Sequence, residues 1–347
     1  MLKRLSFART HLLLAILLVV VLVLSAAVGA FGFTPAEMVR YVAQGLGWSA
    51  PSESDALARN VFLRLRLPRV LLSALSGAVL GVSGTMMQGL FRNPIVEPGL
   101  VGTSAGAALG ASLVFVFGAG AFAAPLGSLA VPLLAFAGAF GATMLVYRLS
   151  TAFGKVNVFT LLLAGIAVNA VCAAGTGFLS YIARDPQARN ITFWSLGTYT
   201  TATWRGVALA FAVGFAWSLR DAKALNALML GEDEAAYLGV DPQRLVLRLL
   251  ILNTLMVAVA TAMTGVIAFV GLVVPHVLRI VKSSDYRFLL PASALFGAAL
   301  MAGTDVIARI IIPPAELPIG IITALVGAPV FLTILLRQGR GGAGFHG

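Results

Sequence analysis

Apolar stretches of about 20 residues recur along the whole chain, with short polar segments between them. Each stretch is long enough for a helix to cross a bilayer core of about 30 Å. The predicted spanning segments are residues 12–31, 66–89, 99–117, 125–147, 158–182, 202–219, 245–264, 265–281, 288–311 and 318–336. The pattern predicts an all-α integral membrane protein of about ten transmembrane helices, some of them broken or short.

The stretch 245–281 is the most difficult to divide into helices. It is continuously apolar and long enough for two crossings. Gly265, Gly271 and Pro275 mark the places where a helix would bend or break. We therefore expect two helices here, with an interruption between them.

The first apolar segment allows two interpretations. It follows Lys3, Arg4 and Arg9, as the apolar core of a signal peptide does, and the small residues 26–28 suit a signal peptidase. Its length favours a retained transmembrane helix instead. Charge bias leaves the choice open, because loss of this segment would not change the orientation of the others.

Composition excludes a water-soluble fold. Of the 347 residues, 59% are hydrophobic and 11% are charged, whereas soluble domains carry about 25% charged residues. The single cysteine, Cys172, lies inside an apolar run, so a disulfide framework is excluded. The whole chain, residues 1–347, is expected to form a single transmembrane domain.

Glycine is abundant, with 37 residues. In a membrane, small residues four apart allow two helices to approach closely. Two such stripes occur, Gly77/Gly81 and Gly102/Gly106/Gly110. We expect them to pack helices within one subunit rather than to form a dimer seam.

The net charge of +11 comes from Lys and Arg residues in the short segments between apolar runs. This placement is a topology signal rather than a nucleic-acid site. The positive-inside rule predicts that both termini are cytoplasmic. Residues 224–245 then form a cytoplasmic loop, and residues 32–65 and 183–201 form periplasmic segments.

Candidate catalytic chemistry is absent from the sequence. It contains no H-E-x-x-H, G-x-S-x-G or G-x-x-x-x-G-K-[ST] motif, and His11, His276 and His346 are scattered. We expect no catalytic residue, no metal site and no cofactor bound by this chain, so any ATP and Mg would be held by a partner. Asp305 and Arg309 have the spacing of a local ion pair.

Two inner segments carry distinctive signals. In residues 89–110, Pro94 and Pro98 end one helix and start the next, which predicts a rigid elbow. In the loop 224–245, Glu232-Asp233-Glu234 predicts the start of a short helix bounded by Gly231 and Gly239. This acidic run is either simple helix capping or part of a docking surface for a soluble partner.

On the outer side, residues 64–69 read RLRLPR and place three arginines just before a spanning segment. This placement runs against the positive-inside rule. Fixed cations on this side should attract an acidic partner or an anionic substrate.

Several of these motifs carry a family resemblance. They are RLPR (66–69), SGTMMQGLFRNPIVEPGLVGTSAGAALGA (83–111), LLLAGIAVN (161–169), LGEDEAAYLGVD (230–241), GVIAFVGLVVPHVLR (265–279) and AELPIGIITALVGAPVFLTIL (315–335). The chain resembles the permease family of type II ATP-binding-cassette importers, which carry vitamin B12, ferric siderophores and heme. The resemblance implies a ten-helix subunit that works as a homodimer in the bacterial inner membrane. Its partners would be two separate ATPase subunits and a periplasmic binding protein.

Matching motifs imply roles for individual residues. Binding-protein docking would fall on Arg66, Arg69 and Arg309, and the cytoplasmic gate on Asn93, Ile95, Val158 and Phe159. Coupling to the ATPase would involve Gly231, Glu232, Glu234, Ala235, Leu238 and Gly239. The apolar pair at 158 and 159 departs from the small polar residues of some relatives.

The substrate is less constrained than the family. Residues 180–204 most resemble the heme branch, where Arg184 and Arg189 would meet propionates and Tyr181, Phe193 and Trp194 would offer apolar surface. An ordinary outer loop with an aromatic belt explains them equally well. Heme is the leading substrate, with ferric siderophore or vitamin B12 next. A proton-coupled carrier or an intramembrane enzyme is a distant alternative, because the spans hold almost no carboxylates and no reactive constellation.

Overall fold

The computed structural model describes residues 6–50, 55–121, 126–151, 156–204, 219–312 and 315–342. Within these ranges the regular structure is entirely helical, which confirms the predicted all-α class. The long helices are α1 (Phe7–Ala27), α4 (Leu67–Leu90), α5 (Thr103–Ala121), α7 (Ala130–Ser150), α8 (Val158–Ile182), α13 (Pro242–Thr264), α15 (Tyr286–Ile310) and α16 (Ile319–Gly342). The shorter ones are α2 (Pro35–Gly45), α3 (Ala56–Val61), α9 (Asp185–Ser195), α11 (Ala222–Leu228), α12 (Glu232–Tyr237) and α14 (Val270–Val281).

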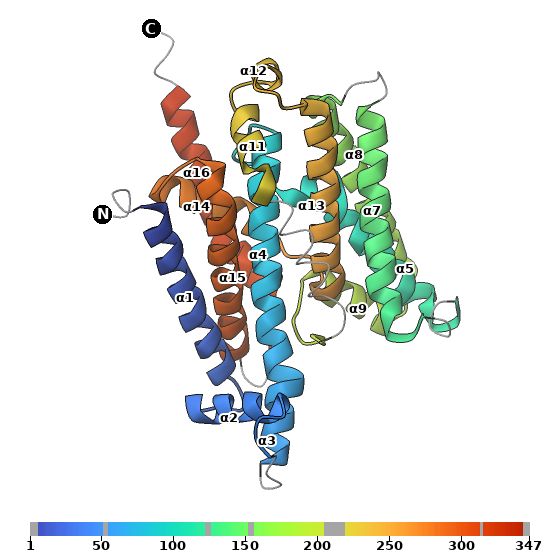
Figure 1. The fold of residues 1–347 in the computed structure, drawn as a ribbon. Helices are drawn as coiled ribbons and strands as arrows, with labels where there is room; N and C mark the ends of the chain where they lie inside the picture. The colour runs from blue at the N-terminus through green and yellow to red at the C-terminus, as the bar shows by residue number, and fades with distance from the viewer. Residues whose placement is uncertain are drawn as a thin grey trace.

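The long helices run side by side, and several of the short ones lie at the two ends of the bundle (Figure 1). α11 and α12 lie at one end, called here the α12 end, and α2 and α3 lie at the opposite end, called the α3 end. α1 begins and α16 ends in the half of the molecule that carries α12. The loop 224–245, expected to be cytoplasmic, and the segment 32–65, expected to be periplasmic, thus lie at opposite ends of the bundle.

The described helices agree with most of the predicted spanning segments. Six are long and apolar enough to cross a bilayer, namely α1, α7, α8, α13, α15 and the continuous helix Ala56–Leu90 that contains α4. Shorter apolar helices occupy Thr103–Gly118, Val270–Val281 and Ile319–Thr333. Most of the predicted span 202–219 falls on residues 205–218, which lie outside the described residues.

The predicted crossing at 265–281 is a half-helix instead. α13 ends at Thr264 and is followed by Gly265, whose φ is +73°, and α14 starts after Phe269, whose φ is +68°. The 12 residues of α14 cover only about 18 Å at 1.5 Å per residue. Its first turn is stabilised from the elbow, because a carboxylate oxygen of Glu97 accepts a hydrogen bond from the Phe269 N–H at 2.7 Å.

α4 is the central helix of the subunit, with nearly all of its residues buried. Its polar side chains find partners on the surrounding elements, as lipid-excluded polar groups must. The Ser76 hydroxyl lies 2.6 Å from the Tyr199 hydroxyl, and Thr85 lies 2.7 Å from Ser293 of α15. Ser83 donates to Asn253 of α13. These contacts hold three separate parts of the chain on α4.

Close packing of α4 against α15 depends on glycine. A Cβ on Gly77 would lie 2.1 Å from the Gly297 carbonyl oxygen, and one on Gly297 would lie 2.3 Å from the Gly77 carbonyl oxygen. The stripe on α5 is used in the same way, since a Cβ on Gly106 would lie 2.4 Å from the carbonyl oxygen of Gly138 in α7. The expectation that the stripes pack helices within the subunit is confirmed.

α1 packs along α15 rather than standing apart from the bundle. Near its start, the Nε2 atom of His11 lies 3.2 Å from the Phe288 carbonyl oxygen, and the rings of Phe7 and Phe288 are 5.1 Å apart. At its other end, two arginines donate to its last carbonyl groups. These contacts fasten α1 to the bundle near both of its ends.

The helix contact at Gly77 leads to a stability prediction. Gly77→Ala should lower the free energy of unfolding by about 1–3 kcal/mol, because the added methyl group meets backbone that has no room to move. Gly141→Ala in α7 is the matched control, since a Cβ there meets nothing within 4 Å. Thermal unfolding of both variants in detergent measures the difference, and equal melting temperatures would contradict the packing described here.

Candidate functional site

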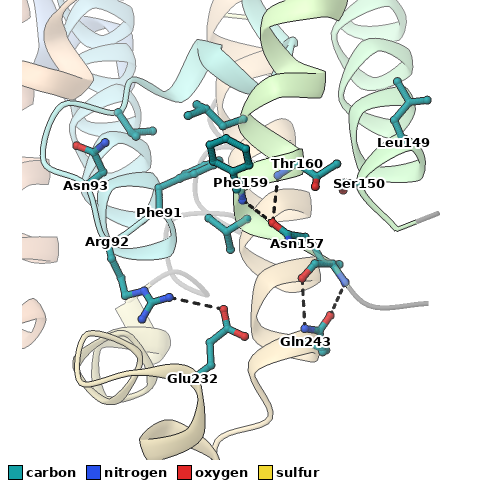
Figure 2. A pocket seen from close by; sticks show the side chains of 14 residues that line it. Phe91, Arg92, Asn93, Leu149, Ser150, Asn157, Phe159, Thr160, Glu232 and Gln243 are labelled. Atoms are coloured by element: carbon teal, nitrogen blue, oxygen red, sulfur yellow. Dashed lines mark hydrogen bonds and ion pairs between the residues drawn. The ribbon is translucent and has the colours of Figure 1, made fainter. Parts of the chain in front are cut away.

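A cavity of about 850 Å³ opens near the α12 end of the subunit. The elbow after α4, the end of α7, the start of α8 and the α12–α13 segment all contribute to its wall (Figure 2). Its lining includes Asn93, Val158 and Phe159, three of the four predicted gate residues, together with Glu232 of the predicted coupling segment. The fourth, Ile95, packs beside the cluster of Leu272 and Val273 in α14 and does not line this cavity.

The start of α8 is held in place by two sets of hydrogen bonds (Figure 2). The side-chain oxygen of Asn157 accepts from the backbone N–H groups of Phe159 and Thr160 at 2.9 and 3.2 Å, as an N-cap does. The Val156 N–H donates to the side-chain oxygen of Gln243 in α13 at 2.8 Å. The Phe159 side chain is therefore presented on a fixed backbone.

The elbow is a tight turn with one unusual backbone angle. Arg92 has φ +47°, a left-handed conformation that non-glycine residues adopt uncommonly. The Asn93 side chain then accepts from the Ile95 N–H at 3.1 Å, which closes a turn of the Asx type. Asn93 thus supports the shape of the elbow as well as lining the cavity.

α12 agrees with the short helix predicted at the acidic run. Gly231 and Gly239, with φ of +145° and +81°, terminate it on either side as expected. Glu232 lies 3.8 Å from Arg92, and both side chains are partly exposed, so the pair contributes little stability. It does place the predicted coupling helix directly beside the elbow (Figure 2).

α11, which packs against α12, is attached to α15. The Asn226 side chain donates to the Asp285 carboxylate at 2.8 Å, and the Asn226 oxygen accepts from the Tyr286 N–H at 3.0 Å. Asp285 is the N-cap of α15. Hydrogen bonds from Arg287 lower the pKa of Asp285 to about 2, so the carboxylate stays charged at neutral pH.

The surface of the 229–239 segment combines acidic and apolar groups. Tyr237 is 91% exposed and Leu238 is 64% exposed, although neither lies in a spanning helix. Glu234 is exposed as well, whereas Ala235 is fully buried. Of the residues predicted for coupling, Ala235 therefore packs against the rest of this chain and does not present its side chain to a partner.

A cluster of five charged residues occupies the α3 end. The Arg69 guanidinium contacts two carboxylates at 2.8 Å, those of Asp305 and Glu316. Asp305 also lies 3.0 Å from Arg309, which confirms the ion pair expected from their spacing. These contacts join α4, α15 and the connection between α15 and α16.

Arg66 and Arg309 are mostly buried and turn toward the end of α1. Arg66 donates to the carbonyl oxygens of Val28 and Phe31. Arg309 donates to the Ser25 carbonyl oxygen at 3.0 Å and to Val28. The three arginines predicted to dock a partner are thus brought together, but all three have partners inside this chain.

The residues predicted to contact substrate lie on and beside α9. Arg184 precedes the helix and is exposed, and the Arg189 guanidinium lies 5.6 Å from the centre of the Phe193 ring. Tyr181, at the end of α8, is exposed. Residues 185–195, expected within a loop, form a short helix because Pro186 at its start and the Gln187 side chain bonded to the Arg184 N–H favour one.

Sequence reasoning missed Arg92, Gln243 and Glu316 as members of these sites. Arg92 stands next to Asn93 in the elbow, and Glu316 lies inside the motif AELPIGI, so both were within segments already singled out. Their partners are remote in sequence and therefore carry no local signal.

The comparisons with known proteins agree with this geometry. The model of the FecCD transport family matches residues 17–337. The hemin transport system permease protein HmuU of Yersinia pestis is 44% identical over 298 residues, covering 83% of this chain and 86% of that protein. The vitamin B12 import system permease protein BtuC of Klebsiella pneumoniae is 40% identical over 304 residues, covering 86% of this chain and 89% of that protein.

A solved structure shows the same arrangement of helices. It is described as an inward-facing conformation of a metal-chelate type ABC transporter, with a TM-score of 0.81, 31% identity, and coverage of 95% of this chain and 99% of that one. The chain belongs to the FecCD transport family and is a multi-pass membrane permease of the type II ABC importer class.

Proposed function

We propose that this permease carries heme into the cytoplasm, using ATP that a separate subunit hydrolyses. The observation that carries the proposal is the 44% identity to a hemin transport permease over 83% of the chain. Arg184, Arg189 and the aromatic side chains around α9 add cations and apolar surface of the kind that a porphyrin with propionates requires. Vitamin B12 is the second candidate, because a vitamin B12 permease is 40% identical. A ferric siderophore is the third.

We place the α12 end in the cytoplasm and the α3 end in the periplasm of a bacterial inner membrane. The positive-inside rule supports this orientation. The cavity beside Phe159 then opens toward the cytoplasm, with Asn93, Val158 and Phe159 as the gate. Ile95 does not line the cavity and would support the gate indirectly, by packing the elbow against α14.

The working unit is a homodimer. α8 supports this, since most of its apolar side chains are exposed in the single chain, among them Val171 and Phe178. A face of this kind needs a partner helix or lipid. A second copy related by a two-fold axis would cover it and enclose a shared pathway.

The 231–239 segment is the contact for the ATPase subunit. Its exposed Tyr237 and Leu238, next to the acidic side chains of α12, form a small apolar patch with a charged rim. Gly231 and Gly239 permit the turns that project this helix, and Glu232 connects it to the elbow through Arg92. Movement of the ATPase would thus reach the gate through one short segment.

The periplasmic binding protein docks at the α3 end, on the surface around Arg66, Arg69 and Arg309. Three arginines against two acids leave this cluster with a net positive charge. The two-fold axis of a homodimer would present the cluster twice, once to each lobe of one binding protein. Acidic side chains on the binding protein would be attracted there.

Uptake in proteoliposomes tests the substrate. The permease, its ATPase and a heme-loaded binding protein of the same organism should together transport heme across the vesicle membrane. Transport should occur only when ATP is present on the side of the membrane to which the ATPase is bound. Vitamin B12 and a ferric siderophore, each with its own binding protein, serve as the matched alternatives. Import of either compound without any heme import would contradict the heme assignment while leaving the permease role intact.

The coupling assignment has its own variant. Glu234→Lys should weaken attachment of the ATPase and lower transport, because a reversed charge at a desolvated contact costs several kcal/mol. Asp185→Lys is the control, since it reverses an exposed acid in the first turn of the short helix α9. Pull-down of the ATPase with the purified permease measures attachment. An ATPase retained equally by both variants would refute this role of α12.

A further inference from the structure

Arg69 is the one member of the docking cluster that holds a solvent-reachable acid. Its Nε and Nη2 atoms donate to Asp305 at 2.9 and 2.8 Å, and its Nη1 atom donates to both oxygens of Glu316 at 2.8 Å. The Asp305 side chain is 0% exposed, whereas that of Glu316 is 34% exposed. The guanidinium therefore has one fully buried partner and one partly exposed partner.

Asp305 cannot leave this arrangement without large cost. It is shared between Arg69 and Arg309, and its removal would leave two mostly buried cations short of a counter-charge. Arg66 and Arg309 are bound to carbonyl oxygens at the end of α1, which would lose their donors if these arginines turned outward. Glu316 is the group whose departure the cluster tolerates.

The surroundings of Glu316 allow its side chain to move alone. The backbone that follows Glu316 is anchored, because the Leu317 N–H donates to the Ala308 oxygen and the Ile319 N–H donates to the Gly197 oxygen, both at 3.1 Å. Beside the side chain lies a hollow of about 350 Å³, also lined by Thr198 and Thr200. If the Glu316 carboxylate left Arg69, this hollow could hold it, and the two threonine hydroxyl groups or solvent could hydrogen-bond to it.

We infer that Glu316 is an internal competitor for the binding protein, occupying the Arg69 guanidinium until an acidic side chain of the docking partner replaces it. The inference rests on the docking surface proposed above and specifies which residue exchanges. Glu316 lowers the net charge of the cluster from two positive charges to one and fills the position that an incoming carboxylate needs. Docking is thus an exchange of carboxylates at one guanidinium, and it stays readily reversible.

Neutralising Glu316 tests this exchange. The permease–ATPase complex in nanodiscs, carrying Glu316→Gln, should bind the heme-loaded binding protein about two- to fivefold more tightly than the parent, the range expected from loss of a partly exposed ion pair. Glu316→Asp, which keeps the charge but shortens the reach, should change affinity in the same direction by less. Raising salt to about 1 M should shrink the difference between variant and parent, because the Debye length falls to about 3 Å.

Glu37→Gln is the matched control, since it removes one partly exposed carboxylate from α2 at the same end without touching the cluster, and a Gln side-chain oxygen can still accept from the Thr34 N–H in the capping box. Its affinity should equal that of the parent. Unchanged or weaker binding by Glu316→Gln at an unchanged melting temperature would overturn the inference, as would an equal gain in Glu37→Gln. Arg69→Ala distinguishes the docking surface from the exchange at Glu316. If the parent binds and Arg69→Ala does not, the docking surface is supported independently of the result for Glu316→Gln. A parent complex that fails to bind the partner overturns both.

Discussion

Backbone hydrogen bonding in the bilayer is the constraint on which this structure depends. A free amide or carbonyl group in the hydrocarbon core costs several kcal/mol, so the chain stays helical wherever lipid surrounds it. It leaves the helix only where protein supplies the missing partners. The break between α13 and α14 obeys this rule, because Glu97 accepts the Phe269 N–H at the start of α14. Glu97 belongs to the elbow that also carries Asn93, so the break and the predicted gate share one support.

Close contact between backbones makes that support rigid. A Cβ on Gly271 of α14 would lie 2.5 Å from the Pro98 ring of the elbow, and one on Gly84 of α4 would lie 1.8 Å from the Gly271 carbonyl oxygen. α4 and α14 therefore meet backbone to backbone at this point, and the elbow packs on α14 through the Pro98 ring. Packed elements of this kind move as bodies rather than deform continuously. If α12 couples to the ATPase as proposed, a displacement of α12 would move the elbow as a unit.

Much of this arrangement was predictable because its signals are local. Apolar runs located the long helices, Gly231 and Gly239 bounded α12, and Pro94 and Pro98 located the elbow. The length of α14 was not predictable, since the 265–281 stretch is apolar throughout and its first helical residue is decided by Glu97, more than 150 residues away in sequence. The burial of Ala235 and the position of Ile95 away from the cavity likewise depend on neighbours that the local pattern does not identify.

The charged residues show most clearly why sequence position and role differ. The motif RLRLPR predicts cations at one side of the membrane, and the structure does bring Arg66, Arg69 and Arg309 together there. The three arginines differ in their partners, however. Arg66 and Arg309 hold the end of α1, whereas Arg69 is paired with a partly exposed acid, Glu316. A cation held by buried carbonyl groups, and in the case of Arg309 also by the buried Asp305, gains little by turning to a new partner. One paired with an exposed carboxylate exchanges one charge for another at small net cost. Recognition at this end would therefore be concentrated on the arginine whose partner is easiest to replace.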